Sequence, residues 1–234
     1  MEVKIEVKQQ EKEMNLAFAM SDFYQLLSLS LQFPSEELAM ALCDGVFWED
    51  GLSILEELSC SIEDLQRVTD VINQLKTTNV TADEIYKQMK QEYTRLFNDP
   101  KNPQLAIYES LFLYKLKENG EKPMLFLSPE AVNAEKCYKE AGVRVVNTSR
   151  EPADHIATEL EFMMFLYGNK GKALKELNVQ ELDNISKAIE TFQQKHLGKW
   201  ADAFFERLET DTTLEHYRGI ARLAKAGLGC LKEV

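Results

Sequence analysis

The sequence has little of the two residues that most often mark turns. It contains 10 glycines and 6 prolines among 234 residues, about 7% together, whereas average usage is about 12%. So few turn residues in a long chain indicate few, long elements, which disfavours sandwiches and barrels. Apolar residues make up 44% of the chain, a content typical of a packed globule and not of a disordered chain.

Basic side chains are also scarce, since 27 Lys and Arg stand against 39 Asp and Glu and give a net charge of −12. We expect no nucleic-acid partner, because binding a phosphate backbone needs clustered positive charge. The apolar stretch 14–33 is interrupted by polar residues and closed by Pro34, so it predicts neither a membrane span nor a signal peptide. We therefore expect a cytoplasmic protein without stable membrane association.

Cysteine is rare and unclustered. No Cys-x-x-Cys pair and no zinc-type spacing occurs among the four residues, which are Cys43, Cys60, Cys137 and Cys230. We expect four free thiols, as is usual in a reducing cytosol.

Helical periodicity dominates the rest of the pattern. Apolar residues recur every three or four positions in three stretches, 84–97, 177–197 and 214–231. Helix N-caps followed by acidic residues are predicted at four positions, Ser35, Ser61, Thr81 and Ser128. The β-branched stretch 143–146 is interpreted as an extended connection. The fold class is therefore all-α, one globular helical domain of about ten helices.

A polar loop near residues 147–152 suggests a division of this domain into two lobes joined by a hinge. The predicted parts are a frayed N-terminus (1–13), an N-terminal helical lobe (14–146), a hinge (147–153) and a C-terminal helical lobe (154–234). A plain interhelical loop at the same place remains the alternative.

The densest group of functional side chains lies beside this loop, in the stretch EPADHIATELE (151–161). Pro152 is placed to open a helix that ends at Gly168. On that helix His155 and Glu159 would share one face, with Glu151 just before it.

Three interpretations of this cluster stay open. In the first, the acids favour a helix N-terminus and His155 pairs with Glu159. In the second, a metal-dependent helical enzyme uses Glu151, His155 and Glu159, although neither a zincin nor a di-iron spacing is present. In the third, an acidic rim and an apolar floor bind a peptide, with floor candidates Phe47, Trp48, Leu111, Phe112, Tyr114, Met124 and Phe126. No nucleophile elbow or phosphate-binding loop occurs, so we expect no catalysis and no cofactor.

One stretch, EPADHIATELEFMMFL (151–166), resembles the signature of the TorD/DmsD family of cytoplasmic redox enzyme maturation chaperones. Weaker similarities follow in order along the chain, in EYTRLFNDP (92–100), YESLF (108–112), YKEAGV (138–143), HLGKWADAFFERL (196–208) and HYRGIARLAKAGL (216–228).

The resemblance implies an all-helical chaperone without catalysis. It would bind the twin-arginine signal peptide or apoenzyme of a molybdopterin oxidoreductase and hold this client until its cofactor is inserted, as a monomer or a domain-swapped dimer. The family's client site maps onto Asp154 and His155, with Glu151 and Pro152 shaping the hinge. Glu159, Tyr108 and Phe112 complete the predicted site. If His155 pairs with a carboxylate, its pKa should rise, and client binding should weaken above about pH 7.

Overall fold

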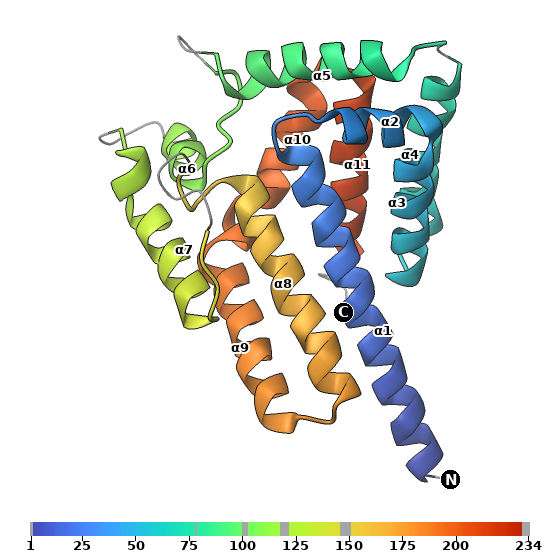
Figure 1. Cartoon of the computed structure of the whole chain (residues 1–234), viewed down its shortest axis with the longest axis vertical. Coiled ribbons are helices and arrows are strands. Elements are labelled where there is room, and N and C mark those ends of the chain that lie inside the picture. Colours follow the sequence, from blue (N-terminus) through green and yellow to red (C-terminus); the bar gives the residue numbers. More distant parts are fainter. Residues whose placement is uncertain (1, 78, 100–102, 118–121, 146–150, 231–234) are drawn as a thin grey trace.

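The structure, a computed structural model, describes residues 2–77, 79–99, 103–117, 122–145 and 151–230 (Figure 1). Within these ranges it contains eleven α-helices and two 3-10 helices. In chain order they are α1 (Glu2–Leu31), α2 (Glu36–Asp44), α3 (Val46–Glu57), α4 (Ile62–Lys76), α5 (Ala82–Phe97), α6 (Glu109–Lys117), η1 (Leu125–Leu127), α7 (Pro129–Glu140), α8 (Ile156–Lys175), α9 (Val179–Lys195), η2 (Leu197–Lys199), α10 (Ala201–Asp211) and α11 (Glu215–Cys230). These ranges hold no strand, and the all-α prediction is confirmed.

Local sequence accounts for several helix starts. The four predicted N-cap side chains each accept a hydrogen bond from the backbone N–H three residues ahead: Ser35, Ser61, Thr81 and Ser128. At Thr81 the carboxylate of Glu84 also accepts from the Thr81 N–H, which completes a capping box. These bonds satisfy N–H groups that have no partner inside the helix, so the caps determine where the helices begin.

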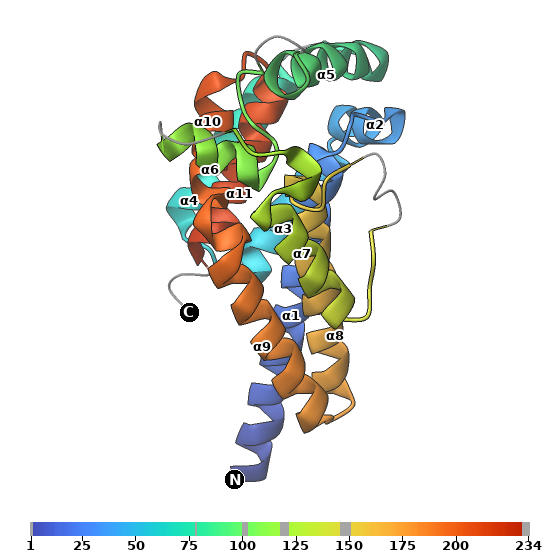
Figure 2. The same cartoon turned by 90° about the vertical axis from the view of Figure 1, so that its left-hand side faces the viewer.

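Helices α1 and α8 lie side by side in antiparallel orientation (Figures 1 and 2). Polar side chains of α1 donate to backbone carbonyls along α8: Ser28 to Ala157 at 2.8 Å, Ser21 to Met164 at 3.0 Å and Gln10 to Leu174 at 2.7 Å. Between these bonds, Phe23, Tyr24 and Leu27 of α1 are fully buried. The segment 1–13 is thus helical from Glu2 onward, and its residue Gln10 contacts α8.

The predicted bounds of the helix after Pro152 are wrong at both ends. The helix begins at Ile156, after an extended His155, and it continues through Gly168 to Lys175. It continues because α1 packs against it closely. A Cβ atom at Gly171 would lie 2.7 Å from the ring of Phe18, so glycine here permits close approach and does not end the helix.

The expectation of four free thiols is also wrong, because Cys60 and Cys230 form a disulfide. The fold packs α11 against α3 and α4, and this brings the end of α11 to the turn before α4. The Cα atoms of the two cysteines are 5.4 Å apart, although 170 residues separate them in the sequence. Cys43 and Cys137 remain free.

The connection between α7 and α8 determines where the candidate site lies. Residues 143–145 belong to no helix or strand. Of the predicted hinge, residues 147–150 lie outside the described residues, and the division into two lobes stays a prediction. In the described part of the chain, no helix is both long enough and apolar enough to cross a membrane.

Candidate functional site

His155 occupies the N-cap of α8, and the adjacent backbone holds it in place. Its Nδ1 accepts a hydrogen bond from the N–H of Ala157 at 3.1 Å. An isolated antiparallel bridge pairs His155 with Tyr108, and the Ile156 N–H donates to the carbonyl of Ile107. This bridge keeps His155 extended, so the helix cannot start at Pro152 as predicted.

Burial lowers the pKa of His155 to about 4. The imidazole is therefore neutral, because burial removes the hydration that would stabilise its charged form. The expected rise in its proton affinity is wrong. The Glu151 carboxylate lies 3.9 Å from Nε2, and the structure places Glu159 with other partners.

Asp154 lies in the interior and joins α8 to α6. Its side chain is fully buried, and Oδ2 accepts a hydrogen bond from the N–H of Ser110 at 3.0 Å. Its backbone carbonyl accepts from the N–H of Glu109 at 2.9 Å. Burial raises the pKa of Asp154, although the bonds from Ser110 oppose this rise. The carboxylate thus holds the start of α6 against the residue before His155.

Tyr108, Glu151 and His155 lie in contact with one another, with His155 buried and the other two partly exposed. The Tyr108 hydroxyl donates to Glu151 Oε1 at 2.6 Å, and the Tyr108 ring packs against the imidazole with centroids 5.4 Å apart. Burial and the bond to Glu151 raise the pKa of Tyr108, so its hydroxyl stays protonated. The Glu151 side chain is 44% exposed, which leaves its carboxylate open to a ligand.

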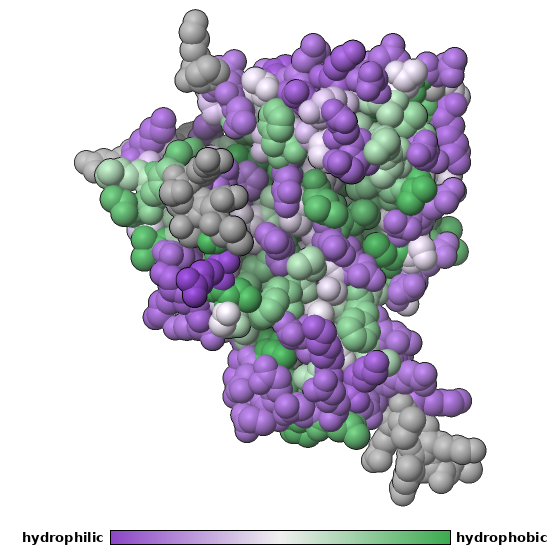
Figure 3. All heavy atoms as spheres, viewed as in Figure 1, coloured by the Kyte–Doolittle hydropathy of each residue, from purple (hydrophilic) through white to green (hydrophobic). Residues whose placement is uncertain are grey.

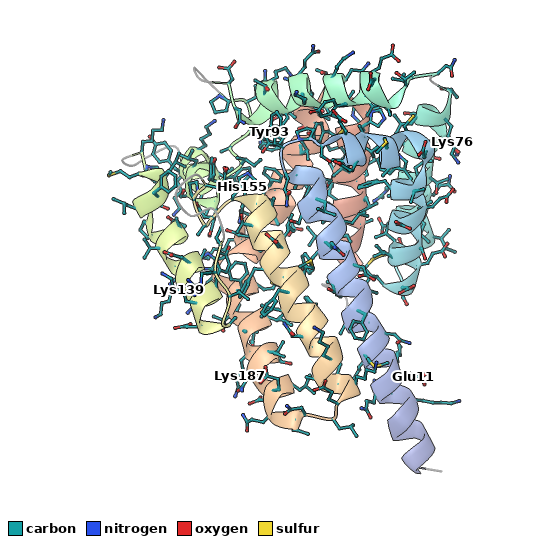
Figure 4. All side chains as sticks on the ribbon, viewed as in Figure 1. Glu11, Lys76, Tyr93, Lys139, His155 and Lys187 are labelled. Atoms are coloured by element: carbon teal, nitrogen blue, oxygen red, sulfur yellow. A yellow bond between two sulfur atoms is a disulfide. The ribbon has the colours of Figure 1, made fainter. Side chains whose placement is uncertain are left out.

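A pocket of about 770 Å³ opens beside these residues, a volume in the range of known ligand pockets. Glu151 and His155 line it, with apolar and aromatic side chains forming most of the wall. The other lining residues are Gln32, Phe33, Tyr93, Asn98, Tyr138, Val143, Arg144, Val145, Ala157, Thr158, Glu161, Phe162, Met164 and Phe165. Figure 4 labels two of the lining residues, His155 at the upper end of α8 and Tyr93 on α5 above it.

The charge and polarity of this lining are mixed. Glu151 and Glu161 supply two carboxylates against the single guanidinium of Arg144. Phe33, which follows α1, is 52% exposed although it is large and apolar. In the space-filling view, apolar side chains lie open between hydrophilic ones over α1 and α8 (Figure 3). The pocket therefore combines an apolar floor with a rim that carries more negative than positive charge.

Five of the predicted site residues do not line this pocket, and one of them, Tyr108, contacts it only through Glu151 and His155. Asp154, Glu159 and Phe112 are buried, and Phe112 packs against Trp200 and Phe204 in the core. Pro152 is buried as well. The floor candidates from the sequence do not line the pocket either, whereas Phe33, Tyr93 and Phe165 do. No sequence signal marked Phe33, because only the antiparallel contact of α1 with α8 brings it there.

Glu159 belongs to a second, interior cluster with Glu109 and His196. Trp200 Nε1 donates to Glu159 Oε2 at 3.0 Å, and His196 Nδ1 lies 2.7 Å from Glu109 Oε2. Burial, and then the charge of Glu109, raises the pKa of Glu159 well above its usual range. Burial lowers the pKa of His196, but hydrogen bonds to Cys137 and Glu109 outweigh this effect and raise it to about 9.

The structure does not support the metal set Glu151, His155 and Glu159. The first two lie at the pocket, whereas Glu159 is turned toward Trp200 in the core. Among the described residues, the side chains whose ligand atoms converge are Glu109, Glu159 and His196. The sequence grouped Glu159 with Glu151 and His155 instead of with Glu109 and His196, because helical spacing cannot show contacts between distant helices.

Comparison with known proteins identifies the family of the chain. The family model of the nitrate reductase delta subunit matches residues 62–206. The chain is 26% identical over 178 residues to the chaperone protein TorD of Vibrio parahaemolyticus serotype O3:K6 (strain RIMD 2210633), which covers 74% of this chain and 73% of that protein. It is 33% identical over 81 residues to the chlorate reductase assembly chaperone protein of Ideonella dechloratans, 34% of this chain and 41% of that protein. No solved structure matches the chain.

A family model that covers more than half of the chain establishes its class. The protein belongs to the nitrate reductase delta subunit family of TorD-like redox enzyme maturation chaperones. Members of this family are chaperones and not enzymes. The family resemblance seen in the sequence, and the expectation of a chaperone without catalysis, are confirmed.

Proposed function

We propose that the pocket beside His155 binds a peptide segment of a molybdopterin oxidoreductase, either its twin-arginine signal peptide or a surface of the apoenzyme. The bound chaperone would hold this client in the cytoplasm until the molybdenum cofactor is inserted. The observation that carries the proposal is the pocket itself, because an apolar floor lies next to the exposed carboxylate of Glu151.

Electrostatics supports a client segment with a basic head. The protein carries a net charge of −12, and complementary charge raises the rate of encounter and selects partners. Within the pocket, Glu151 and Glu161 offer carboxylates that guanidinium groups bind well. The Tyr108 hydroxyl also orients the Glu151 side chain through a hydrogen bond. The Glu151 side chain therefore loses less conformational entropy when a client binds.

Apolar burial supplies most of the expected affinity. Phe33 is 52% exposed, and Met164 and Phe165 are half-buried along the pocket wall. Covering the exposed part of a phenylalanine contributes about 1–2 kcal/mol, which corresponds to about five- to thirtyfold in affinity.

The predicted site residues then divide into two groups. Glu151, His155 and Tyr108 would contact the client or orient groups that do. Asp154, Pro152, Glu159 and Phe112 lie in the interior and would act by holding the pocket in shape. On this proposal, the Asp154–His155 pair supports one site through two different physical roles.

Isothermal titration calorimetry with a synthetic twin-arginine leader peptide tests the apolar floor. We expect Phe33→Ser to weaken binding about tenfold, because it removes apolar surface from the pocket. Leu29→Ser is the matched control, since Leu29 is 51% exposed in the last turn of α1 and does not line the pocket. Equal losses in both variants would show that the peptide does not use this pocket.

The rim is tested in the same titration with Glu151→Gln. We expect binding to weaken about three- to fivefold at low salt, in keeping with roughly 1 kcal/mol for a partly exposed ion pair, and this difference should shrink as salt rises. Glu130→Gln removes an acid from the start of α7, outside the pocket, and controls for the change in net charge. An equal loss of affinity in both variants would show that the peptide is attracted by the net charge of the protein and not by the Glu151 carboxylate.

A further inference from the structure

Three ligand-type side chains converge in the core from elements that are distant in the sequence. They are Glu109 at the start of α6, Glu159 in α8 and His196 between α9 and η2. Each offers one donor atom, and these atoms all lie within 4.8 Å of one another. All three residues are buried, with 1% exposure or less.

The outer atoms of this group are held by neighbours. Trp200 Nε1 donates to Glu159 Oε2 at 3.0 Å, and His196 Nε2 lies 2.9 Å from Asn133 Oδ1. Metal-binding histidines and carboxylates are typically oriented by such contacts on the atom that faces away from the ion. Here Glu159 Oε1 has no hydrogen-bond partner on the inner side, and His196 Nδ1 faces Glu109 Oε2.

Two inner oxygens have no hydrogen-bond partner, Glu109 Oε1 and Glu159 Oε1. An unpartnered carboxylate oxygen in the interior is costly, and native proteins satisfy such groups with a donor, water or a cation. Their presence in a closed cluster is an observation separate from the convergence of the three side chains. Either a proton shared between the two carboxylates or a bound cation would satisfy them.

We propose that Glu109, Glu159 and His196 bind one divalent transition-metal ion of the zinc type. Two carboxylates and one imidazole suit Zn²⁺, and the combined charge of the ion and two ionised carboxylates is zero. His196 Nδ1 lies 2.7 Å from Glu109 Oε2, so binding replaces that hydrogen bond with a nitrogen–metal bond and frees Glu109 to turn both oxygens toward the ion.

The ion would have a structural role. Its ligands are closed off from solvent, as in structural zinc sites, which leave no open position for a substrate. It would join α6, α8 and the α9–η2 turn directly behind the residues that hold Asp154 and His155. This inference does not depend on the proposed function, since it concerns the core and not the pocket.

Metal content of the full chain after refolding provides the test. Because the ligands are interior, the ion must enter as the chain folds. The protein is refolded from denaturant with Zn²⁺ or Co²⁺, desalted, and analysed for bound metal. We expect about one equivalent in the wild type and in Cys43→Ser/Cys137→Ser, with a Co²⁺ spectrum that lacks thiolate charge-transfer bands.

Glu109→Gln and Glu159→Gln should both retain less than about one-tenth equivalent, while Glu151→Gln, which alters the pocket, should bind as the wild type does. Circular dichroism establishes that each variant has folded. A metal-free wild type would overturn the proposal by itself and assign the two oxygens to a proton shared between Glu109 and Glu159. Equal binding by a folded Glu109→Gln variant, or loss of the ion in the cysteine variant, would overturn it as well.

Discussion

Replacing Asp154 with alanine tests whether this carboxylate acts through the fold or through the client. In the structure its Oδ2 accepts the N–H of Ser110 at 3.0 Å, and both residues are buried. Asp154→Ala would leave that N–H without a partner, at a cost of about 1–3 kcal/mol. Removing a buried carboxylate whose pKa is raised by burial recovers part of this cost, so we expect a net loss of about 2 kcal/mol.

For a chain of this length, 1 kcal/mol shifts the unfolding midpoint by about 2–4 °C. Asp154→Ala should therefore unfold about 4–8 °C below the wild type in a thermal scan followed by circular dichroism. Asp154→Asn is the matched control. Its amide oxygen can still accept from Ser110, so its midpoint should lie within about 2–3 °C of the wild type.

Leader-peptide affinity, measured below the unfolding transition, completes the comparison. If Asp154 has only a structural role, Asp154→Asn should bind the peptide as the wild type does, because the buried Asp154 side chain does not contact the peptide. Suppose instead that Asp154→Ala unfolds at the wild-type temperature while peptide binding is lost in both variants. Asp154 would then contact the client directly, and the interior role derived from its bond to Ser110 would be refuted.

Two further predictions concern the core. Burial lowers the pKa of both His155 and His216 to about 4, so each is neutral in the fold but binds a proton in the unfolded chain below about pH 6.5. Each histidine should lower the free energy of unfolding by about 2–3 kcal/mol as pH falls from 7 to 4.5. Urea unfolding should therefore show a smaller loss of stability over that range in His216→Gln than in the wild type. Equal losses in the two proteins would contradict the lowered pKa of His216. In α11, Gly227→Ala should destabilise by about 1–3 kcal/mol, because its Cβ would lie 2.3 Å from the ring of Phe23. A Cβ atom at Gly229 would meet nothing within 4 Å, so Gly229→Ala should stabilise the protein by about 0.5–1 kcal/mol. If the urea midpoints of the Gly227→Ala and Gly229→Ala variants shift in the same direction, the close packing of Gly227 against Phe23 is wrong.

Local signals predicted much of the helical structure. Thr81 and Glu84 form the capping box that their spacing indicates, and the periodic stretch after them is the helix α5. These features depend on residues within one or two turns, so the chain carries them wherever the helix packs. The all-α class follows from the same short-range physics.

Prediction was weaker where distant elements meet. Spacing placed His155 and Glu159 on one helical face, whereas the backbone of residues 107–109 holds His155 extended and Trp200 takes the carboxylate of Glu159. Gly168 resembled a helix end because its neighbour α1 is absent from a local pattern. No periodicity could indicate that Phe33 would line the same pocket as Glu151.

The amino-acid sequence alone determined the helices, the family and the stretch 151–161 around which the site is built. Tertiary structure decided which of those side chains face solvent, placing Glu151 on the pocket rim and Asp154 inside. It also joined Glu109 to His196, which lie 87 residues apart, and Cys60 to Cys230. The reason is physical: caps and helices depend on neighbours along the chain, whereas burial and pairing depend on neighbours in space, which only the packed core supplies.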